Sequence, residues 1–300
     1  MTLWISITVA AAFFQTLRFM LQRQLSLGTL SASGATLARF LYSAPLAAVG
    51  ITLYLVASEQ ALPAVPLSFW LFAAAGGVAQ ILATVAVVML FKARNFAVGV
   101  TFQKTAVMQA VLTGWLLLGD TVSVWGFVAI ALGLVGVLLL SVPPELARFG
   151  WRDLMNRAAG LGLGAGFLFS ISGVSYRGAS LSLALDDPFA RAGLTLAAVT
   201  AMQTLAMVFW LRWRDPGQVR AVWEARRVAV WVGLLSMAGS FCWFTAFTLQ
   251  NAAYVNAVGQ IELVFSGLAS VLIFREAVTR REWVGMGILM ASILTLVLLI

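Results

Sequence analysis

Two ionisable side chains in this 300-residue sequence stand deep inside long apolar runs: Lys104 and Glu262. Lys104 lies about nine residues beyond Asn95, and Glu262 lies about nine residues into its run, which corresponds to roughly 13 Å along a helix. Because a charge inside a lipid bilayer is costly, such groups usually serve a function. An ammonium and a carboxylate in one cavity could bind the carboxylate and the ammonium of a zwitterionic substrate. The alternatives are a structural ion pair between two helices and, for Lys104, a side chain that extends along its helix to the membrane surface.

Amide, hydroxyl and aromatic side chains near the middle of other apolar runs complete the candidate binding residues. Amides and hydroxyls can shape a site for a small polar molecule, or they can form interhelical hydrogen bonds worth about 0.6 kcal/mol each. Aromatic rings can line an apolar pocket or anchor a helix at the membrane surface. The predicted cavity residues are Gln15, Phe19, Tyr42, Gln80, Lys104, Ser170, Ser240, Trp243, Asn256, Gln260 and Glu262.

The patterns typical of catalysis and metal binding are absent from the sequence. It contains no histidine and one cysteine, Cys242, so it offers no Cys-based metal site. It has neither a GxxxxGK[ST] phosphate loop nor an HExxH zinc motif. We therefore predict a protein that is not an enzyme, with no catalytic residue, no metal and no cofactor.

The composition indicates a membrane protein. Hydrophobic residues make up 62% of the chain and charged residues 10%, whereas a soluble domain has about 45–50% and 25%. Lipid must therefore surround most of the chain. The net charge of +8 is better explained by Lys and Arg in cytoplasmic loops than by nucleic-acid binding. We expect the lipid bilayer and a small-molecule substrate as partners, and no nucleic acid.

Ten windows are long and apolar enough to cross a bilayer as helices, which takes roughly 20 residues each. The runs are continuous rather than alternating, so they favour helices over a transmembrane β-barrel. The N-terminal run has no basic leader and no cleavage site, and we interpret it as a retained span. The predicted spans are about 3–24, 34–57, 67–91, 97–118, 122–141, 158–176, 188–211, 228–250, 254–274 and 282–300.

The stretches 91–105, "FKARNFAVGVTFQKT", and 247–261, "FTLQNAAYVNAVGQI", share a pattern. Several matches at one offset favour a duplication, although chance similarity between apolar sequences is the alternative. The alignment pairs Phe91 with Phe247, Asn95 with Asn251, Lys104 with Gln260 and Asp120 with Glu276.

An odd number of spans in each copy would invert the second copy in the membrane. Residues 1–141 would form the first five-helix repeat, 142–157 a connecting loop, and 158–300 the second repeat. A pseudo-two-fold axis in the membrane plane would relate them, with the site at their interface near mid-depth. The predicted fold is therefore an all-α integral membrane protein with ten transmembrane helices in two inverted five-helix repeats around a central cavity. A single chain supplies both halves, so a monomer can work alone.

Positive charge gathers on one side of the predicted membrane. Because Lys and Arg collect on the cytoplasmic side, we predict that both termini face the periplasm. The opposite side carries Arg177 and Arg191. The predicted cytoplasmic side carries Arg18, Arg23, Arg39, Lys92, Arg94, Arg148, Arg152, Arg157, Arg212, Arg214, Arg220, Arg226, Arg227, Arg275, Arg280 and Arg281.

The runs "LLLGDTVSVWGFVAIALGLVGVLLL" (116–140) and "LIFREAVTRREWVGMGILMASILTLVLL" (272–299) resemble the drug/metabolite transporter superfamily, of the EamA type. In that family an acidic residue follows an apolar run, and a pattern with Trp or Gln and then Gly opens the next span. Asp120 with Gly126, and Glu276 with Gly285, fit those positions. The resemblance covers essentially the whole chain.

More narrowly, the chain is similar to bacterial inner-membrane exporters of aromatic amino acids. This resemblance implies export of Phe, Tyr, Trp and other neutral amino acids, by rocking of two halves about a central cavity. It also leaves open a termini-inside orientation, which is common in the family. Other members carry nucleotide sugars, sugar phosphates, nucleobases or drugs. A membrane-embedded enzyme and a receptor are the alternatives to a transporter. A sugar-phosphate carrier should place several Lys or Arg in the cavity, where Lys104 is the clear candidate.

Overall fold

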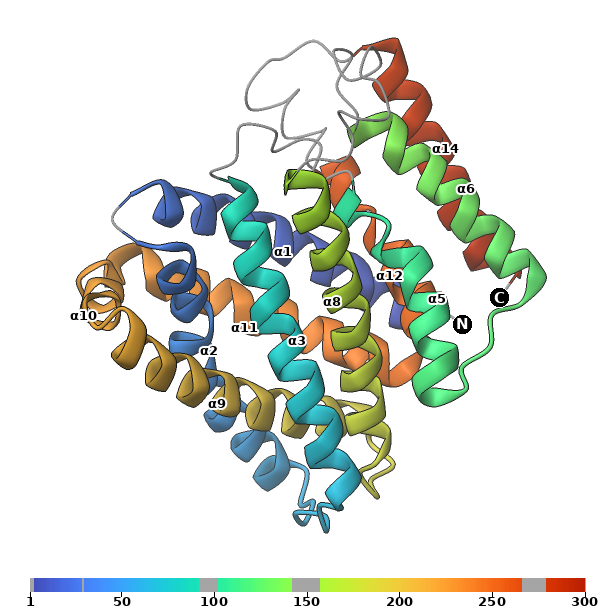
Figure 1. Cartoon of the computed structure of the whole chain (residues 1–300). Coiled ribbons are helices and arrows are strands. Elements are labelled where there is room, and N and C mark those ends of the chain that lie inside the picture. Colours follow the sequence, from blue (N-terminus) through green and yellow to red (C-terminus); the bar gives the residue numbers. More distant parts are fainter. Residues whose placement is uncertain (1–2, 29, 92–101, 142–156, 266–278, 300) are drawn as a thin grey trace.

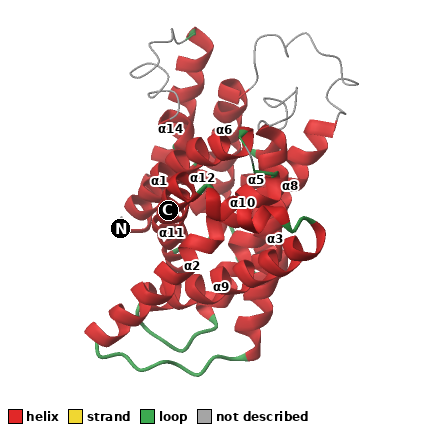
Figure 2. Ribbon diagram, turned by 90° about the vertical axis from the view of Figure 1, so that its left-hand side faces the viewer, coloured by secondary structure: helices red, strands yellow, loops and turns green. Residues whose placement is uncertain are grey.

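A computed structural model describes residues 3–28, 30–91, 102–141, 157–265 and 279–299 of the chain. Within these ranges every regular element is a helix (Figure 1, Figure 2). The predicted all-α class is confirmed for them. The matches at Asn95 and Glu276, and the charges at Lys92, Arg94, Arg148, Arg152 and Arg275, lie outside the described residues.

Seven of the described helices are long and apolar enough to cross a membrane. The predicted spans 97–118, 122–141 and 254–274 contain shorter apolar helices, and parts of the first and last of these spans lie outside the described residues. A short helix, α10, was not predicted; it occupies the connection around residue 220. The helices are α1 (Leu3–Leu27), α2 (Ala32–Ala57), α3 (Leu67–Phe91), α5 (Ala106–Leu118), α6 (Val124–Ser141), α8 (Arg157–Leu181), α9 (Pro188–Arg214), α10 (Gly217–Glu224), α11 (Arg226–Leu249), α12 (Ala252–Gly259) and α14 (Arg280–Leu299).

Short polar side chains fix where several helices begin. Ser31 accepts a hydrogen bond from the Gly34 N–H at 3.1 Å and caps α2. Asn251 caps α12 in the same way, by accepting from the Ala253 N–H at 2.9 Å. These side chains satisfy backbone N–H groups that the first helical turn leaves unpaired. A glycine fixes where α5 ends. Gly119 takes the left-handed conformation there, with φ 69°, which glycine adopts without strain.

The helices associate in long pairs that join the two halves of the chain. α3 lies along α8, α1 along α11, α2 along α9, and α6 along α14. Figure 1 shows α6 and α14 side by side at one edge of the helix group, where they pack on α5 and α12. Each of these pairs takes one helix from residues 1–141 and one from residues 157–299.

The α6–α14 pair is held together by glycines. A Cβ atom on Gly136 would lie 2.8 Å from the Leu289 nitrogen and 2.9 Å from the Gly285 oxygen, and one on Gly285 would lie 3.0 Å from the Gly136 oxygen. The two backbones therefore touch where side chains are missing, as small residues allow in membrane helix pairs.

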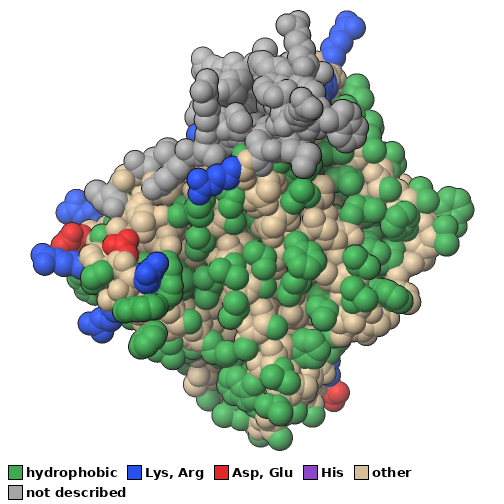
Figure 3. Space-filling model, in the orientation of Figure 1, with side chains coloured by type: hydrophobic (Ala, Val, Ile, Leu, Met, Phe, Trp, Pro, Cys, Tyr) green, Lys and Arg blue, Asp and Glu red, His purple; other side chains and the backbone are tan. Residues whose placement is uncertain are grey.

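The surface between the ends of the helices is apolar. Leu53, Phe209 and Leu298 are 64%, 78% and 74% exposed. Figure 3 shows hydrophobic side chains across the middle of one face, with charged side chains near its margins. Exposed apolar area on this scale indicates contact with lipid.

Candidate functional site

A polar cavity lies among α1, α2, α3, α8, α11, α12 and residues 103–107. The volume of the cavity that is open to the centres of water molecules is about 100 Å³. A single water needs roughly 10–15 Å³ by that measure, so the cavity has room for a small organic molecule or several waters. Most of the predicted cavity residues line it: Gln15, Phe19, Gln80, Lys104, Ser240, Trp243, Asn256, Gln260 and Glu262.

Two of the predicted residues, Tyr42 and Ser170, lie outside this cavity. Tyr42 is at the contact of α2 with α11, where Gly233 lets the helices approach, and it lines a separate hollow. Ser170 is fully buried, and its hydroxyl donates to the Phe167 carbonyl at 2.8 Å. Ser172, two residues further along α8 and so on another face of the helix, lines the cavity instead.

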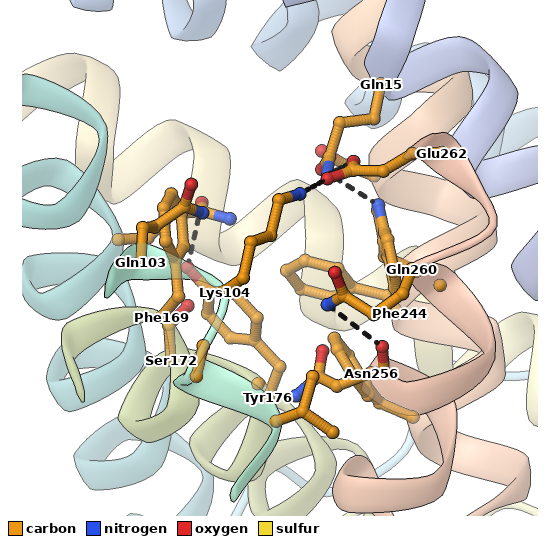
Figure 4. A pocket seen from close by; sticks show the side chains of 18 of the residues that line it. Gln15, Gln103, Lys104, Phe169, Ser172, Tyr176, Phe244, Asn256, Gln260 and Glu262 are labelled. Atoms are coloured by element: carbon orange, nitrogen blue, oxygen red, sulfur yellow. Dashed lines mark hydrogen bonds and ion pairs between the residues drawn. The ribbon is translucent and has the colours of Figure 1, made fainter. Parts of the chain in front are cut away.

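Lys104 and Glu262 form an ion pair inside the cavity (Figure 4). Their side chains are 6% and 12% exposed. The other carboxylate oxygen of Glu262 accepts a hydrogen bond from the Gln15 side chain at 2.7 Å, and Gln15 in turn accepts one from the Trp243 indole at 3.1 Å. Lys104 is therefore directed at Glu262 and does not extend to the membrane surface. The pair connects the first half of the chain with the second.

Both partners of this ion pair lie at interruptions of their helices. Residues 104–105 form a turn before α5, and residues 260–261 form a turn between α12 and a helical segment at 262–265. The Thr105 N–H donates to the Phe102 carbonyl at 3.1 Å, and the Ile261 N–H donates to the Val258 carbonyl at 3.1 Å. These two hydrogen bonds occupy matching positions in the alignment of 91–105 with 247–261.

Arg39 also lines the cavity, and the sequence prediction missed this role. We expected it in a cytoplasmic connection, but α2 begins at Ala32, so Arg39 lies about two turns inside the helix. Its side chain is 5% exposed. Its nitrogens donate to the hydroxyls of Ser236 and Thr84 at 3.0 Å and of Ser240 at 3.4 Å. The predicted span 34–57 already included residue 39, so the sequence did indicate that Arg39 lies inside the membrane.

A second arginine assigned to the same connection, Arg18, is buried as well. It is 3% exposed, donates to the Gln22 side-chain oxygen at 2.6 Å, and lies over the Phe19 ring with 4.2 Å to the centroid. Arg18 and Arg39 should therefore not be counted among the loop charges that predict the cytoplasmic side. The excess of positive charge on that side then rests on the other arginines and Lys92.

Aromatic rings form much of the cavity wall. Tyr176 and Phe244 stack with 4.2 Å between ring centroids, and Trp243 stacks on Phe247 at 5.6 Å. Figure 4 shows Tyr176, Phe244 and Phe169 around the space that Lys104 enters. The Tyr176 hydroxyl and Gln80 are hydrogen-bonded at 2.9 Å. Rings and polar groups together suit a molecule with one apolar and one polar part.

A second ion pair between the halves lies at the ends of helices. Arg177, near the end of α8, donates to the Asp120 carboxylate at 2.9 Å and to the Phe247 carbonyl at 2.9 Å. It therefore joins the α5–α6 connection to the end of α11. In the described part of the chain, no cluster of three or more His, Cys, Asp or Glu side chains is placed to hold a metal ion.

The class of protein follows from these features: a helical, multi-pass membrane protein with a polar cavity between its two halves. Residues 156–298 match the model of the EamA-like transporter family, which is a family of membrane transporters. The resemblance to the EamA type is thereby confirmed. Members of this family are transporters rather than enzymes.

A solved structure supports the fold across the whole chain. It superposes with a TM-score of 0.71 at 13% sequence identity, over 99% of this chain and 96% of its own length. Its title, "Crystal structure of protein", names no activity, and at this identity the likeness concerns the fold alone. No curated protein matches the sequence.

Proposed function

We propose that this chain is a secondary transporter or facilitator that exports small zwitterionic metabolites, with aromatic and other neutral amino acids as the substrate class. Its two halves would alternate in exposing the central cavity to the two sides of the membrane. The observation that carries this proposal is the cavity itself, which has aromatic walls and a buried ion pair, Lys104–Glu262, that joins one half to the other.

The pattern of helix contacts supports an inverted repeat of ten spans. Exchanging the halves replaces α1 by α8, α2 by α9, α3 by α11, α5 by α12 and α6 by α14. Under this exchange the α3–α8 contact becomes the α11–α1 contact, while the α2–α9 and α6–α14 contacts map onto themselves. A two-fold relation between the halves accounts for all four pairs.

The matched helix interruptions support a transport site at the same place. Secondary transporters with inverted repeats bind their substrates near mid-membrane, where broken helices of the two repeats meet. Here the turns at 104–105 and 260–261 lie at aligned positions, and Lys104 and Gln260 both line the cavity. At Thr105 and Gln260 the backbone keeps right-handed helical dihedral angles, so each interruption is a tightened turn with a hydrogen bond between residues three apart, and such turns inside helices often mark functional hinges.

The lining of the cavity favours an amphipathic zwitterion. Lys104 and Glu262 offer both signs of charge, and the stacked rings of Tyr176 and Phe244 offer an apolar surface. An aromatic amino acid presents both kinds of group. A sugar phosphate lacks the apolar part, although Arg39 adds a cation that the sequence prediction did not count.

We propose that the protein lies in the bacterial inner membrane with both termini in the periplasm. Arg212, Arg214, Arg220, Arg226 and Arg227 lie at or near the α9–α11 connection, and this side should be cytoplasmic. A cysteine at Ala61, between α2 and α3, and one at Gly217, between α9 and α11, should react with an impermeant thiol reagent from opposite sides. Labelling from the same side would reject the inverted repeat.

Counterflow in liposomes that contain only this protein tests the function. Vesicles loaded with unlabelled L-phenylalanine should accumulate external radiolabelled L-phenylalanine without ATP, and protein-free vesicles should not. The same assay with labelled glucose 6-phosphate and with labelled uracil tests a sugar phosphate and a nucleobase as substrates. Counterflow of either of these with none of phenylalanine, tyrosine or tryptophan would replace the amino-acid assignment, and release of a chemically altered product would indicate an enzyme.

A further inference from the structure

We propose that Arg39 is the anion-binding residue of the cavity and that it takes a carboxylate group of the transported molecule. The identity of the cargo as an amino acid rests on the proposed function. The anion site itself is argued from the surroundings of Arg39. The sequence had suggested that Lys104 binds the substrate carboxylate.

Arg39 is a buried cation with neutral neighbours. Its hydrogen-bond acceptors are the hydroxyls of Ser236, Thr84 and Ser240. Among the described residues, no carboxylate lies within ion-pair distance of it. A buried charge is costly unless it is paired, and hydroxyls do not cancel a charge. The guanidinium has five N–H donors, and these three bonds leave two for a ligand.

The rest of the cavity leaves this positive charge unbalanced. Lys104 and Glu262 neutralise each other. Arg18, behind the Phe19 ring, adds another buried positive charge and likewise has no carboxylate within ion-pair distance among the described residues. The cavity therefore favours an anionic group, and it does so near Arg39.

The fold connects Arg39 to the Lys104–Glu262 pair through two side chains of α11 that lie one helical turn apart. Ser240 of α11 contacts Arg39, and Trp243 of the same helix contacts Gln15, which holds Glu262. Residues three apart rise about 4.5 Å along a helix and share a face. An anion at Arg39 would leave the other end of the molecule between the Trp243 ring and Glu262.

A carboxylate fits this site better than a phosphate. The planar fork of a guanidinium matches a carboxylate through two parallel hydrogen bonds. A doubly charged phosphate would require a second cation at the cavity wall, but Lys104 is bound to Glu262 and Arg18 does not line the cavity. On the far side, the Gln260 side-chain oxygen is buried and accepts no hydrogen bond from the described part of the chain. That oxygen and Glu262 are acceptors for an ammonium group.

The chain supplies a matched control in Arg191. It stands near the start of α9, as Arg39 stands near the start of α2, and the Ala-Arg pairs at both places suggest equivalent positions in the repeat. Arg191 does not line the cavity. An Arg191→Gln substitution removes the same charge and leaves the proposed anion site intact.

The experiment compares an acid with its uncharged amide. Purified protein in detergent is titrated with 3-phenylpropanoate and with 3-phenylpropanamide, and binding is followed by the shift in Tm. Both probes also compete with labelled L-phenylalanine in counterflow. In the natural protein and in R191Q, the acid should bind about 10- to 100-fold more tightly than the amide, as expected for hydrogen bonds to a charged group. R39Q should lose this preference, and R39K should retain part of it.

Two results would overturn the anion site: equal affinity for acid and amide in the natural protein, or an undiminished preference in R39Q. If R39Q does not fold, an undiminished preference in R39K has the same force, because an ammonium cannot reproduce the two-pronged contact. Acid preference without phenylalanine counterflow keeps the anion site and rejects the amino-acid cargo. Phenylalanine counterflow without acid preference keeps the transport function and rejects Arg39.

Discussion

Among the described residues, two ion pairs join the first half of the chain to the second, and they stand in different surroundings. Lys104–Glu262 lies inside the cavity beside two helix interruptions, and its other contact is an amide, Gln15. Arg177–Asp120 lies where helices end, and Arg177 also binds a backbone carbonyl there. The difference teaches that pairing of charges across the halves does not by itself mark a site. In the proposed function the first pair meets cargo, and the second holds helix ends together.

The largest effect is expected at the cavity pair. Lys104→Met leaves the Glu262 carboxylate buried without its counter-charge, which typically costs about 3–5 kcal/mol. We expect a lower Tm from this cost. Because the cavity also loses its ammonium group, the counterflow rate of L-phenylalanine should fall by about 100-fold, which corresponds to about 2.8 kcal/mol. Gel filtration and Tm report whether the protein stays folded.

The control for this variant is Arg220→Gln. It also breaks an ion pair, Arg220–Glu224, whose side chains are 85% and 59% exposed. Exposed pairs contribute little, so transport and Tm should not change. A double variant, K104M/E262Q, should regain Tm relative to K104M and remain inactive. Unchanged counterflow in a folded K104M protein would show that the cavity pair has no part in transport.

A smaller effect is expected at the pair near the helix ends. Arg177→Gln removes the contacts to Asp120 and to the Phe247 carbonyl. We expect counterflow to fall by about 10-fold or less, because this partly exposed pair positions helix ends and does not contact cargo. Ser180 lies on α8 one turn beyond Arg177 and is buried. In a Cys242→Ser protein, a cysteine at position 180 should react faster with an impermeant thiol reagent when R177Q is present than when Arg177 is retained, because the helix ends separate. Equal damage by R177Q and K104M would erase the distinction between the two pairs.

The α6–α14 contact should affect stability without affecting substrate affinity. Gly136→Ala places a methyl group 2.8 Å from a backbone nitrogen of α14, and such overpacking costs about 1–3 kcal/mol. Gly164→Ala is the control, because a Cβ there meets nothing within 4 Å. We expect a lower Tm for G136A alone and an unchanged half-saturating phenylalanine concentration in both. A weakened apparent affinity in G136A would link this helix pair to the cavity.

The smallest effect concerns Asp187, which caps α9. Partial burial raises the pKa of its carboxyl, but hydrogen bonds from Tyr54, Gln60 and the Phe189 N–H outweigh this and hold the pKa below its ordinary value of 3.8. The ionised group therefore stabilises the folded chain fully above that value, and this stabilisation is lost as pH falls through the folded-state pKa.

Asp187→Asn keeps a capping oxygen but does not titrate. Its Tm should lie close to that of the natural protein at pH 7 and should fall less between pH 5 and pH 3. Asp186→Asn, one residue earlier and exposed, should keep the natural pH dependence. An identical acid response in D187N and the natural protein would exclude Asp187 as a source of that dependence.

Hydropathy sufficed to predict the seven long apolar helices, because a long apolar run in lipid has few alternatives to a helix, but it did not predict the short helix α10. The depth of Lys104 and Glu262 along their runs similarly placed both in one cavity. Arg39 was missed because a charge near a predicted span end was counted as a loop residue, although position 39 lay inside the predicted span 34–57. Tyr42 and Ser170 could not be placed, because mean hydropathy does not tell which face of a helix meets α11 or the cavity. The two helix interruptions could not be predicted either, because residues 104–105 and 260–261 include neither Pro nor Gly, the residues that usually indicate a turn.

Access to the cavity from both sides of the membrane is the central claim, and thiol labelling tests it most directly. A single cysteine replaces Asn256, which lines the cavity, in a Cys242→Ser protein reconstituted with known orientation. An impermeant thiol reagent should reach it from either side, and L-phenylalanine should slow the reaction from both. Reaction from one side alone, unchanged by any substrate tested, would contradict alternating access.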